Sequence, residues 1–139
     1  MSDGEIFNEE AFKQQVLFSG MVYHRRTSNI GISPTDIDLM LELNGNFCMA
    51  EIKKEGTYLT TGQKILFKNM AEMCRNSGKQ FVAFYCTHNE PAHKPVLAAY
   101  TKVKSYLSTY NSDFTELEKE MTLDQAIQGW MAKYNLLGN

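Results

Sequence analysis

Apolar and polar residues alternate most regularly between Asp36 and Lys53. Two apolar-rich runs flank Asn44-Gly45, a dipeptide typical of the two-residue type I′ turn of a β-hairpin. With this turn, Leu43 faces Asn46, Asp38 faces Glu51 and Asp36 faces Lys53. A three-residue turn with a bulge would shift the register by one residue and undo these pairings.

The two faces of the predicted hairpin differ, because residues directly opposite or two apart share a face. One face is entirely apolar and is expected to pack in the core: Ile37, Leu39, Leu41, Leu43, Cys48, Ala50 and Ile52. The other is apolar in the middle and densely charged at one end: Asp36, Asp38, Met40, Glu42, Phe47, Met49, Glu51 and Lys53. The charged end is the feature that needs explaining.

Helical periodicity follows the hairpin and returns near the C-terminus. The pattern predicts a helix over residues 61–76, with Thr60 and Gln63 as a capping box and Gly78 after its end. Its apolar stripe is Leu66, Phe67, Met70, Met73 and Cys74. A second helix is predicted over residues 123–135, with Thr122 and Gln125 as its capping box and a stripe of Ile127, Trp130, Met131 and Tyr134.

Weaker patterns complete the chain. They predict helices over residues 8–19 and 113–120, strands over 21–26, 80–87 and 95–101, and loops over 27–35 and 88–94. This order of elements indicates an α/β or α+β domain with a mixed sheet. The 139 residues fit a single domain, with a core over about 8–101 and a helical extension over about 102–139.

The composition and short motifs of the chain exclude several classes of protein. Three cysteines with no CxxC pair indicate free thiols in a reducing cytoplasm. The acidic start Met1-Ser2-Asp3-Gly4-Glu5 is unlike a signal peptide, and no apolar run is long enough to span a membrane. There is no P-loop for a nucleotide cofactor. A net charge of −2 argues against nucleic-acid binding by bulk charge, though not against a local contact.

The charged end of the hairpin suggests a metal site. Asp38 and Glu51, placed opposite each other, would repel, and a divalent cation between them would reverse that effect. Carboxylate ligands suit Mg²⁺, Mn²⁺ or Ca²⁺ rather than zinc. The alternative is a solvated ionic edge in which Asp36 and Lys53 form an ordinary cross-strand ion pair.

These residues resemble a known family. Pro34-Thr35-Asp36-Ile37-Asp38, followed by Glu51-Ile52-Lys53, is similar to the signature of the PD-(D/E)XK nuclease superfamily. The resemblance covers about residues 8–87 and is closest to small archaeal-type Holliday junction resolvases and phage nucleases. It implies the restriction endonuclease-like αβββαβ core, with a mixed central sheet flanked by helices.

The resemblance also implies roles. Asp38 and Glu51 would be acidic metal ligands, the Ile52 carbonyl would complete the metal site, and Lys53 would be the catalytic lysine. Thr35, inserted after Pro34, leaves open whether Asp36 or Asp38 is the motif aspartate, and the hairpin register favours Asp38. The resemblance further implies a catalytic role for Gln63, for which the structural alternative is the capping box. It also implies that Glu10 or Glu9 joins the metal site, for which the structural alternative is helix-dipole complementarity.

The implied function is a Mg²⁺-dependent endonuclease that hydrolyses DNA, with Mn²⁺ able to substitute, and that belongs to a phage or mobile element. The resolvase subclass would require a homodimer, for which the last helix could supply an interface. The alternative is a catalytically inactive nuclease-fold protein that binds DNA or serves assembly. Basic residues near the motif are candidate DNA contacts: Arg25, Arg26, Lys54, Lys64 and Lys68, with Lys102 and Lys104 after the last predicted strand.

Overall fold

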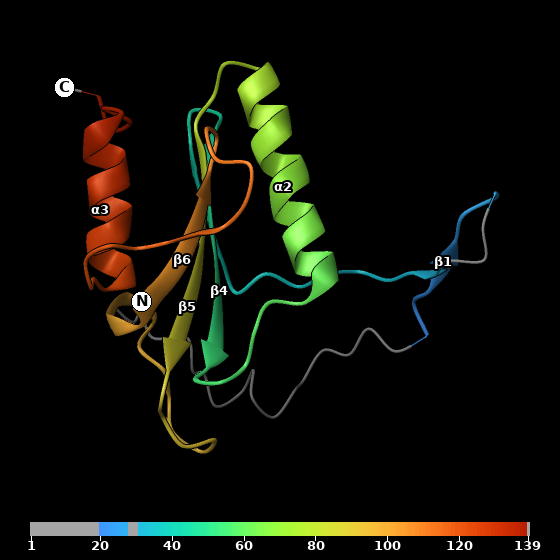
Figure 1. Cartoon of the computed structure of the whole chain (residues 1–139), viewed down its shortest axis with the longest axis horizontal. Helices are drawn as coiled ribbons and strands as arrows, with labels where there is room; N and C mark the ends of the chain where they lie inside the picture. Colours follow the sequence, from blue (N-terminus) through green and yellow to red (C-terminus); the bar gives the residue numbers. More distant parts are fainter. Residues whose placement is uncertain (1–19, 28–30, 139) are drawn as a thin grey trace.

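A five-stranded mixed sheet lies between two helices in the computed structural model, which describes residues 20–27 and 31–138 (Figure 1). The sheet order is β3-β4-β5-β6-β7. Its strands are β3 (Leu39–Leu43), β4 (Asn46–Lys54), β5 (Phe81–His88), β6 (Lys102–Ser108) and β7 (Thr115–Glu116). Only β4 and β5 run parallel, and the other neighbours are antiparallel. The mixed α+β class is therefore confirmed.

Helix α2 (Thr61–Asn76) forms the crossover between the parallel strands β4 and β5 and covers one face of the sheet. Its apolar side packs through Phe67, Ala71 and Cys74 onto Phe81, Leu107 and other side chains of that face. Phe67, Met70 and Cys74 of the predicted stripe pack there, whereas Leu66 is half-buried and packs in neither core cluster, and Met73 is 54% exposed. Ala71 takes a buried place instead, because the face that meets the sheet is rotated from the one expected.

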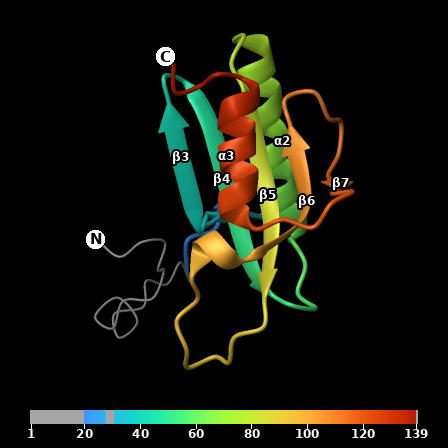
Figure 2. The same ribbon diagram turned by 90° about the vertical axis from the view of Figure 1, so that its left-hand side faces the viewer.

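Helix α3 (Leu123–Lys133) covers the opposite face of the sheet, and Figure 2 shows it in front of the central strands. Trp130, Ala126 and Leu123 are buried against Val82, Phe84 and other core side chains, and Ile127, Met131 and Tyr134 pack at the margin. The predicted stripe is thus used within the chain. Both predicted capping boxes are present, at Thr60–Gln63 and Thr122–Gln125.

The hairpin register is confirmed for the pairs from Leu39–Ala50 to Leu43–Asn46. The predicted pairs Asp38–Glu51 and Asp36–Lys53 lie outside this ladder, because β3 begins only at Leu39. Asn44 and Gly45 have φ values of 51° and 85°, which is the left-handed region that a type I′ turn requires. The apolar face from Leu39 onward packs on the α3 side with Cys48 and Ala50. Ile37 was expected on that face, yet it packs on the α2 side, because β3 begins only at Leu39 and the alternation does not extend before it.

Other expectations are wrong. Residues 95–101 contain a short 3₁₀ helix, η1 (Ala98–Tyr100), and the next sheet strand is β6. Residues 113–120 contain β7 instead of a helix, so the C-terminal part is not purely helical. Residues 31–32, expected in a loop, form β2 (Gly31–Ile32), which pairs with β1 (Tyr23–His24).

The β1-β2 ribbon is a separate two-stranded sheet, away from the main sheet in Figure 1. The αβββαβ core would need the strand over residues 21–26 in the main sheet, so the described elements match that core only from the hairpin onward. The predicted helix over residues 8–19 lies outside the described residues. Cys48, Cys74 and Cys86 are buried free thiols. Among the described residues, we find no helix with the length and apolarity needed to cross a bilayer.

Candidate functional site

Asp38, Glu51 and Lys53 come together where β3 begins and β4 approaches its end. The Ile52 N–H donates to Asp38 Oδ2 at 2.7 Å, which ties the loop before β3 to β4. Lys53 Nζ lies 3.7 Å from Glu51 Oε1. The expected pair of Asp36 and Lys53 is absent from the ion pairs of the described residues, and Asp36 is exposed. Asp38 is therefore the aspartate that contacts β4.

Glu51 is the unusual member of this group. Only 4% of the residue is exposed, and its Oε2 is buried without a hydrogen-bond partner among the described residues. Burial raises the pKa of Glu51 to about 7, and the Asp38 carboxylate adds to the rise while the Lys53 ammonium opposes it. Lys53 pairs with Oε1 only, and a buried carboxylate oxygen without a partner is costly, so Oε2 favours either a proton or a further cation.

The donor set suits a hard divalent cation. Asp38 and Glu51 offer carboxylate oxygens, and the carbonyl of Ile52, next to Glu51 in sequence, would be a third oxygen donor. No three His, Cys, Asp or Glu side chains within residues 20–27 and 31–138 are grouped to hold a metal ion. A metal here would thus rest on two carboxylates, main-chain oxygen and water. Glu9 and Glu10, which we considered as a further ligand, lie outside the described residues.

Gln63 is buried in the first turn of α2, with 4% exposure. Its backbone N–H donates to Thr60 Oγ1 at 3.1 Å, and its Oε1 accepts from the Thr60 N–H at 3.0 Å. The capping alternative for Gln63 is therefore confirmed. Its catalytic role stays a prediction.

The predicted DNA-contacting residues do not form one cluster. Arg25 and Arg26 are exposed just after β1, on the separate ribbon. Lys68 forms an exposed ion pair with Asp113 at 3.3 Å. Lys54 and Lys64 lie nearer the proposed site, since Lys54 ends β4 and Lys64 is in the first turn of α2.

The sequence reasoning missed the neighbours of Glu51 across the sheet. Tyr85 is paired with Glu51 in the β4–β5 register, and its hydroxyl donates to the Thr57 carbonyl. Farther along, Glu55 Oε2 accepts from Thr87 Oγ1 at 2.8 Å, and Glu55 Oε1 lies 3.2 Å from Lys104 Nζ. No sequence spacing predicts these contacts, because they join β4, β5 and β6 across the sheet.

Comparisons of this chain with protein-family models, with curated proteins and with solved structures found no match in any of the three. The case for a function therefore depends on the site itself.

Proposed function

We propose that the protein is a Mg²⁺-dependent endonuclease that hydrolyses DNA phosphodiester bonds at Asp38, Glu51 and Lys53. The observation that carries the proposal is the buried, unpartnered Oε2 of Glu51. It lies in a carboxylate whose pKa is raised partly by the nearby Asp38. A cation between the two carboxylates would offset both the burial and the repulsion.

The roles of the residues follow from their chemistry. Asp38 and Glu51 would hold Mg²⁺, with the Ile52 carbonyl as a further ligand, and Mn²⁺ would fit the same oxygen set. The bound ion supplies Lewis-acid polarisation of a phosphate and a water of lowered pKa. Lys53, whose ammonium already reaches Glu51, would orient that water and balance the charge that develops on the phosphate.

The second candidate is a nuclease-like protein that binds DNA or serves assembly without cutting. It is favoured by the net charge of −2 and by a site with only two carboxylates among the described residues. The buried Glu51 argues against it, because a binding protein without a metal gains nothing from burying a carboxylate oxygen, Oε2, that has no hydrogen-bond partner among the described residues.

Cleavage of plasmid, four-way junction and single-stranded DNA by the full chain in Mg²⁺ or Mn²⁺ tests the proposal. The variants Asp38→Asn and Glu51→Gln remove one metal-binding charge each while keeping the side-chain size. We expect both to bind DNA like the unchanged chain and to cut it at least a hundredfold more slowly, a loss typical of a lost electrostatic contribution to the transition state.

The matched control is Asp36→Asn, which removes the same charge two residues away on an exposed side chain. This variant should cut at the normal rate. Undiminished cleavage by the Asp38 or Glu51 variant would overturn the assignment. A chain that binds DNA but cuts none of the three substrates in either metal would favour the second candidate.

A further inference from the structure

Two hollows meet at the end of the sheet where β4 and β5 finish and β6 begins. One, of about 820 Å³, lies between the loop after β4, the first turn of α2 and strands β6 and β7. The other, of about 800 Å³, is bounded by the loop after β5 and by η1. Both have Glu55, Lys102 and Lys104 in their walls, so the two hollows adjoin each other, and we call them together the lysine trough.

The walls of the trough carry a small excess of positive charge, although the chain is acidic overall. Its walls carry five lysines and four glutamates, whereas the whole chain has a net charge of −2: Lys64, Lys94, Lys102, Lys104, Lys119, Glu55, Glu90, Glu116 and Glu120. Two of the lysines are neutralised, since Lys104 pairs with Glu55 and Lys102 with Glu120. The other three form no ion pair with any residue that the structure describes. Glu90 and Glu116 of the walls form none either, so three lysines and two glutamates are left without an ion pair among the described residues. The three lysines can contact an anionic ligand.

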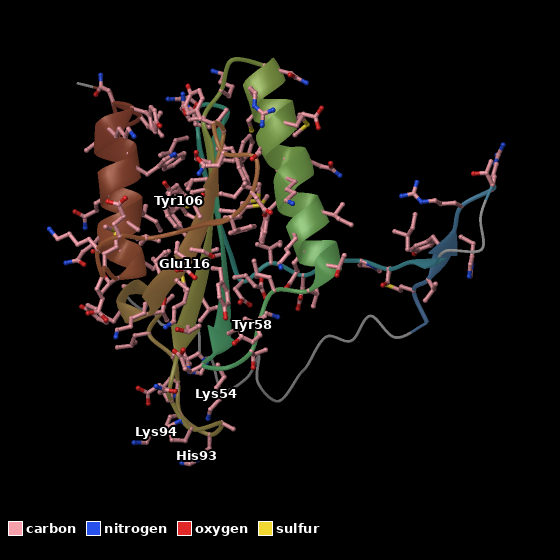
Figure 3. The ribbon with its side chains drawn as sticks, in the orientation of Figure 1. Lys54, Tyr58, His93, Lys94, Tyr106 and Glu116 are labelled. Atoms are coloured by element: carbon pink, nitrogen blue, oxygen red, sulfur yellow. The ribbon has the colours of Figure 1, made fainter. Side chains whose placement is uncertain are left out.

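Each hollow also has an exposed tyrosine in its wall. Tyr58 is 74% exposed in the first hollow, and Tyr100 is 70% exposed in the second. Figure 3 shows Tyr58 and Lys54 at this end of the sheet, with Lys94 farther out beside His93 on the loop after β5. Aromatic rings presented to water beside lysines are the combination that binds single-stranded nucleic acid, in which rings stack on unpaired bases and ammonium groups contact phosphates.

The trough adjoins the proposed catalytic residues. Tyr85 of β5 lies in the wall of the first hollow and is the register partner of Glu51 on the neighbouring strand β4. The trough therefore begins one strand away from the buried carboxylate. Both tyrosine and glutamate belong to the face of the sheet that α2 covers, since Tyr85 packs there and Glu51 follows Met49 by two residues.

We propose that the lysine trough binds single-stranded DNA, with Tyr58 and Tyr100 stacking on unpaired bases and Lys64, Lys94 and Lys119 contacting phosphates. A duplex is the poorer ligand, because its bases are already stacked and only its phosphates are available. That the bound strand is the one to be cut rests on the proposed function, whereas the binding itself does not.

Binding of a labelled oligothymidylate of about 12 nucleotides, a length within the usual site size, tests this in EDTA with the full chain. We expect Tyr58→Ala and Tyr100→Ala each to raise Kd about tenfold, as loss of one stacking contact does. Tyr58→Phe and Tyr100→Phe, which keep the ring, should restore binding. The control is Tyr110→Ala, since Tyr110 is 68% exposed but lies in neither hollow of the trough. Thermal unfolding of each variant verifies that it is folded.

Salt dependence gives an independent readout. Three phosphate contacts predict that log Kd changes with log salt by a slope of about 2, and Lys64→Gln or Lys119→Gln should each reduce the slope by about 0.7. Lys133→Gln, outside the trough, should leave it unchanged. Equal affinity for single strands and duplex, or alanine variants that bind like the unchanged chain, would overturn the proposal.

The two proposals can fail separately. Binding through Tyr58 and Tyr100 without any cleavage in Mg²⁺ or Mn²⁺ would refute the nuclease and leave the trough in place. Cleavage that depends on Asp38 and Glu51 but not on either tyrosine would do the reverse.

Discussion

At the scale of single residues, Glu51 carries a buried carboxylate whose negative charge no neighbouring side chain fully balances. The Lys53 ammonium reaches only one of its two oxygens, and the Asp38 carboxylate adds repulsion. In the absence of a cation, the protein relieves this most cheaply by protonating Glu51. The free energy of unfolding should therefore depend on the protonation state of this one side chain.

The pKa of Glu51 rises from an ordinary 4.5 to about 7 on folding, so the folded chain binds more protons than the unfolded chain between these values. The contribution of Glu51 to stability is therefore lost as the pH rises from about 4.5 to about 7. Glu51→Gln removes this titration. In EDTA, the free energy of unfolding of the unchanged chain should fall by on the order of 3 kcal/mol more than that of the variant between pH 4.5 and 8.

Urea denaturation at the two pH values measures this difference. Asp36→Asn serves as the control for a nearby exposed acid and should follow the unchanged chain. If Glu51→Gln also follows the unchanged chain, Glu51 titrates normally and the main argument for a cation there is lost.

Gly45 tests the turn that sets the register. Its φ of 85° is unfavourable for a residue with a Cβ, and an added Cβ would come within 3.1 Å of Lys79 Cε. Gly45→Ala should lower the free energy of unfolding by about 1–2 kcal/mol. Gly129→Ala, in the middle of α3 with nothing within 4 Å of its added Cβ, should instead raise it by up to about 1 kcal/mol. If both variants were destabilised, the loss of stability could not be assigned to the positive φ at Gly45.

At the scale of elements, the loop before α2 and the first turn of this helix connect the candidate site with the lysine trough. The capping box at Thr60 and Gln63 fixes where the helix begins, and Lys64 follows directly. Because α2 then packs onto the sheet through Phe67 and Ala71, it covers Met49 and contributes to the burial of the face that carries Glu51. The helix start is thus a structural support for a chemical site.

Thr60→Ala and Gln63→Ala separate support from chemistry. Each removes part of the same capping box and should cost about 1 kcal/mol of stability, as measured by chemical denaturation. If Gln63 only caps the helix, both variants should retain the same DNA cleavage rate. A rate at least tenfold lower for Gln63→Ala than for Thr60→Ala at equal stability would show that Gln63 also acts in the reaction.

At the scale of the whole molecule, one end of the sheet carries five lysines and four glutamates, a slight positive excess in a chain that is acidic overall. The strand ends, the first turn of α2 and the start of β6 all meet there, so residues far apart in the chain line one surface. Tyr85 of the trough wall is the register partner of the buried Glu51 on the neighbouring strand. A divalent cation bound by Asp38 and Glu51 would change the net charge of the protein from −2 to 0.

Metal binding should stabilise the whole fold. An ion that binds only the folded chain raises its stability by about 2.7 kcal/mol at a hundred times its Kd. The thermal midpoint should therefore rise on addition of millimolar Mg²⁺ or Mn²⁺, and should not rise in Asp38→Asn or Glu51→Gln. A rise of equal size in those variants would place the ion elsewhere, and no rise in the unchanged chain would refute the metal site.

The sequence by itself determined the local features: the hairpin turn at Asn44-Gly45, its register, the two capping boxes and the α3 stripe. Each depends on residues within a few positions of one another, where backbone preference and short hydrogen bonds decide the outcome. It also singled out Asp38, Glu51 and Lys53, although Asp38 lies before β3 and contacts β4 through the Ile52 N–H instead of through a ladder pair. It mistook residues 95–101 and 113–120, whose apolar patterns are short and suit more than one element.

Only the tertiary structure decided the burial of Glu51, the separation of the β1-β2 ribbon from the main sheet and the meeting of Tyr58, Tyr100 and the lysines around one trough. These depend on which strands pair and which helix covers which face. Such contacts join distant parts of the chain, and the free energy that selects them is the burial of apolar surface over the whole molecule. Spacing along the sequence carries little information about that choice.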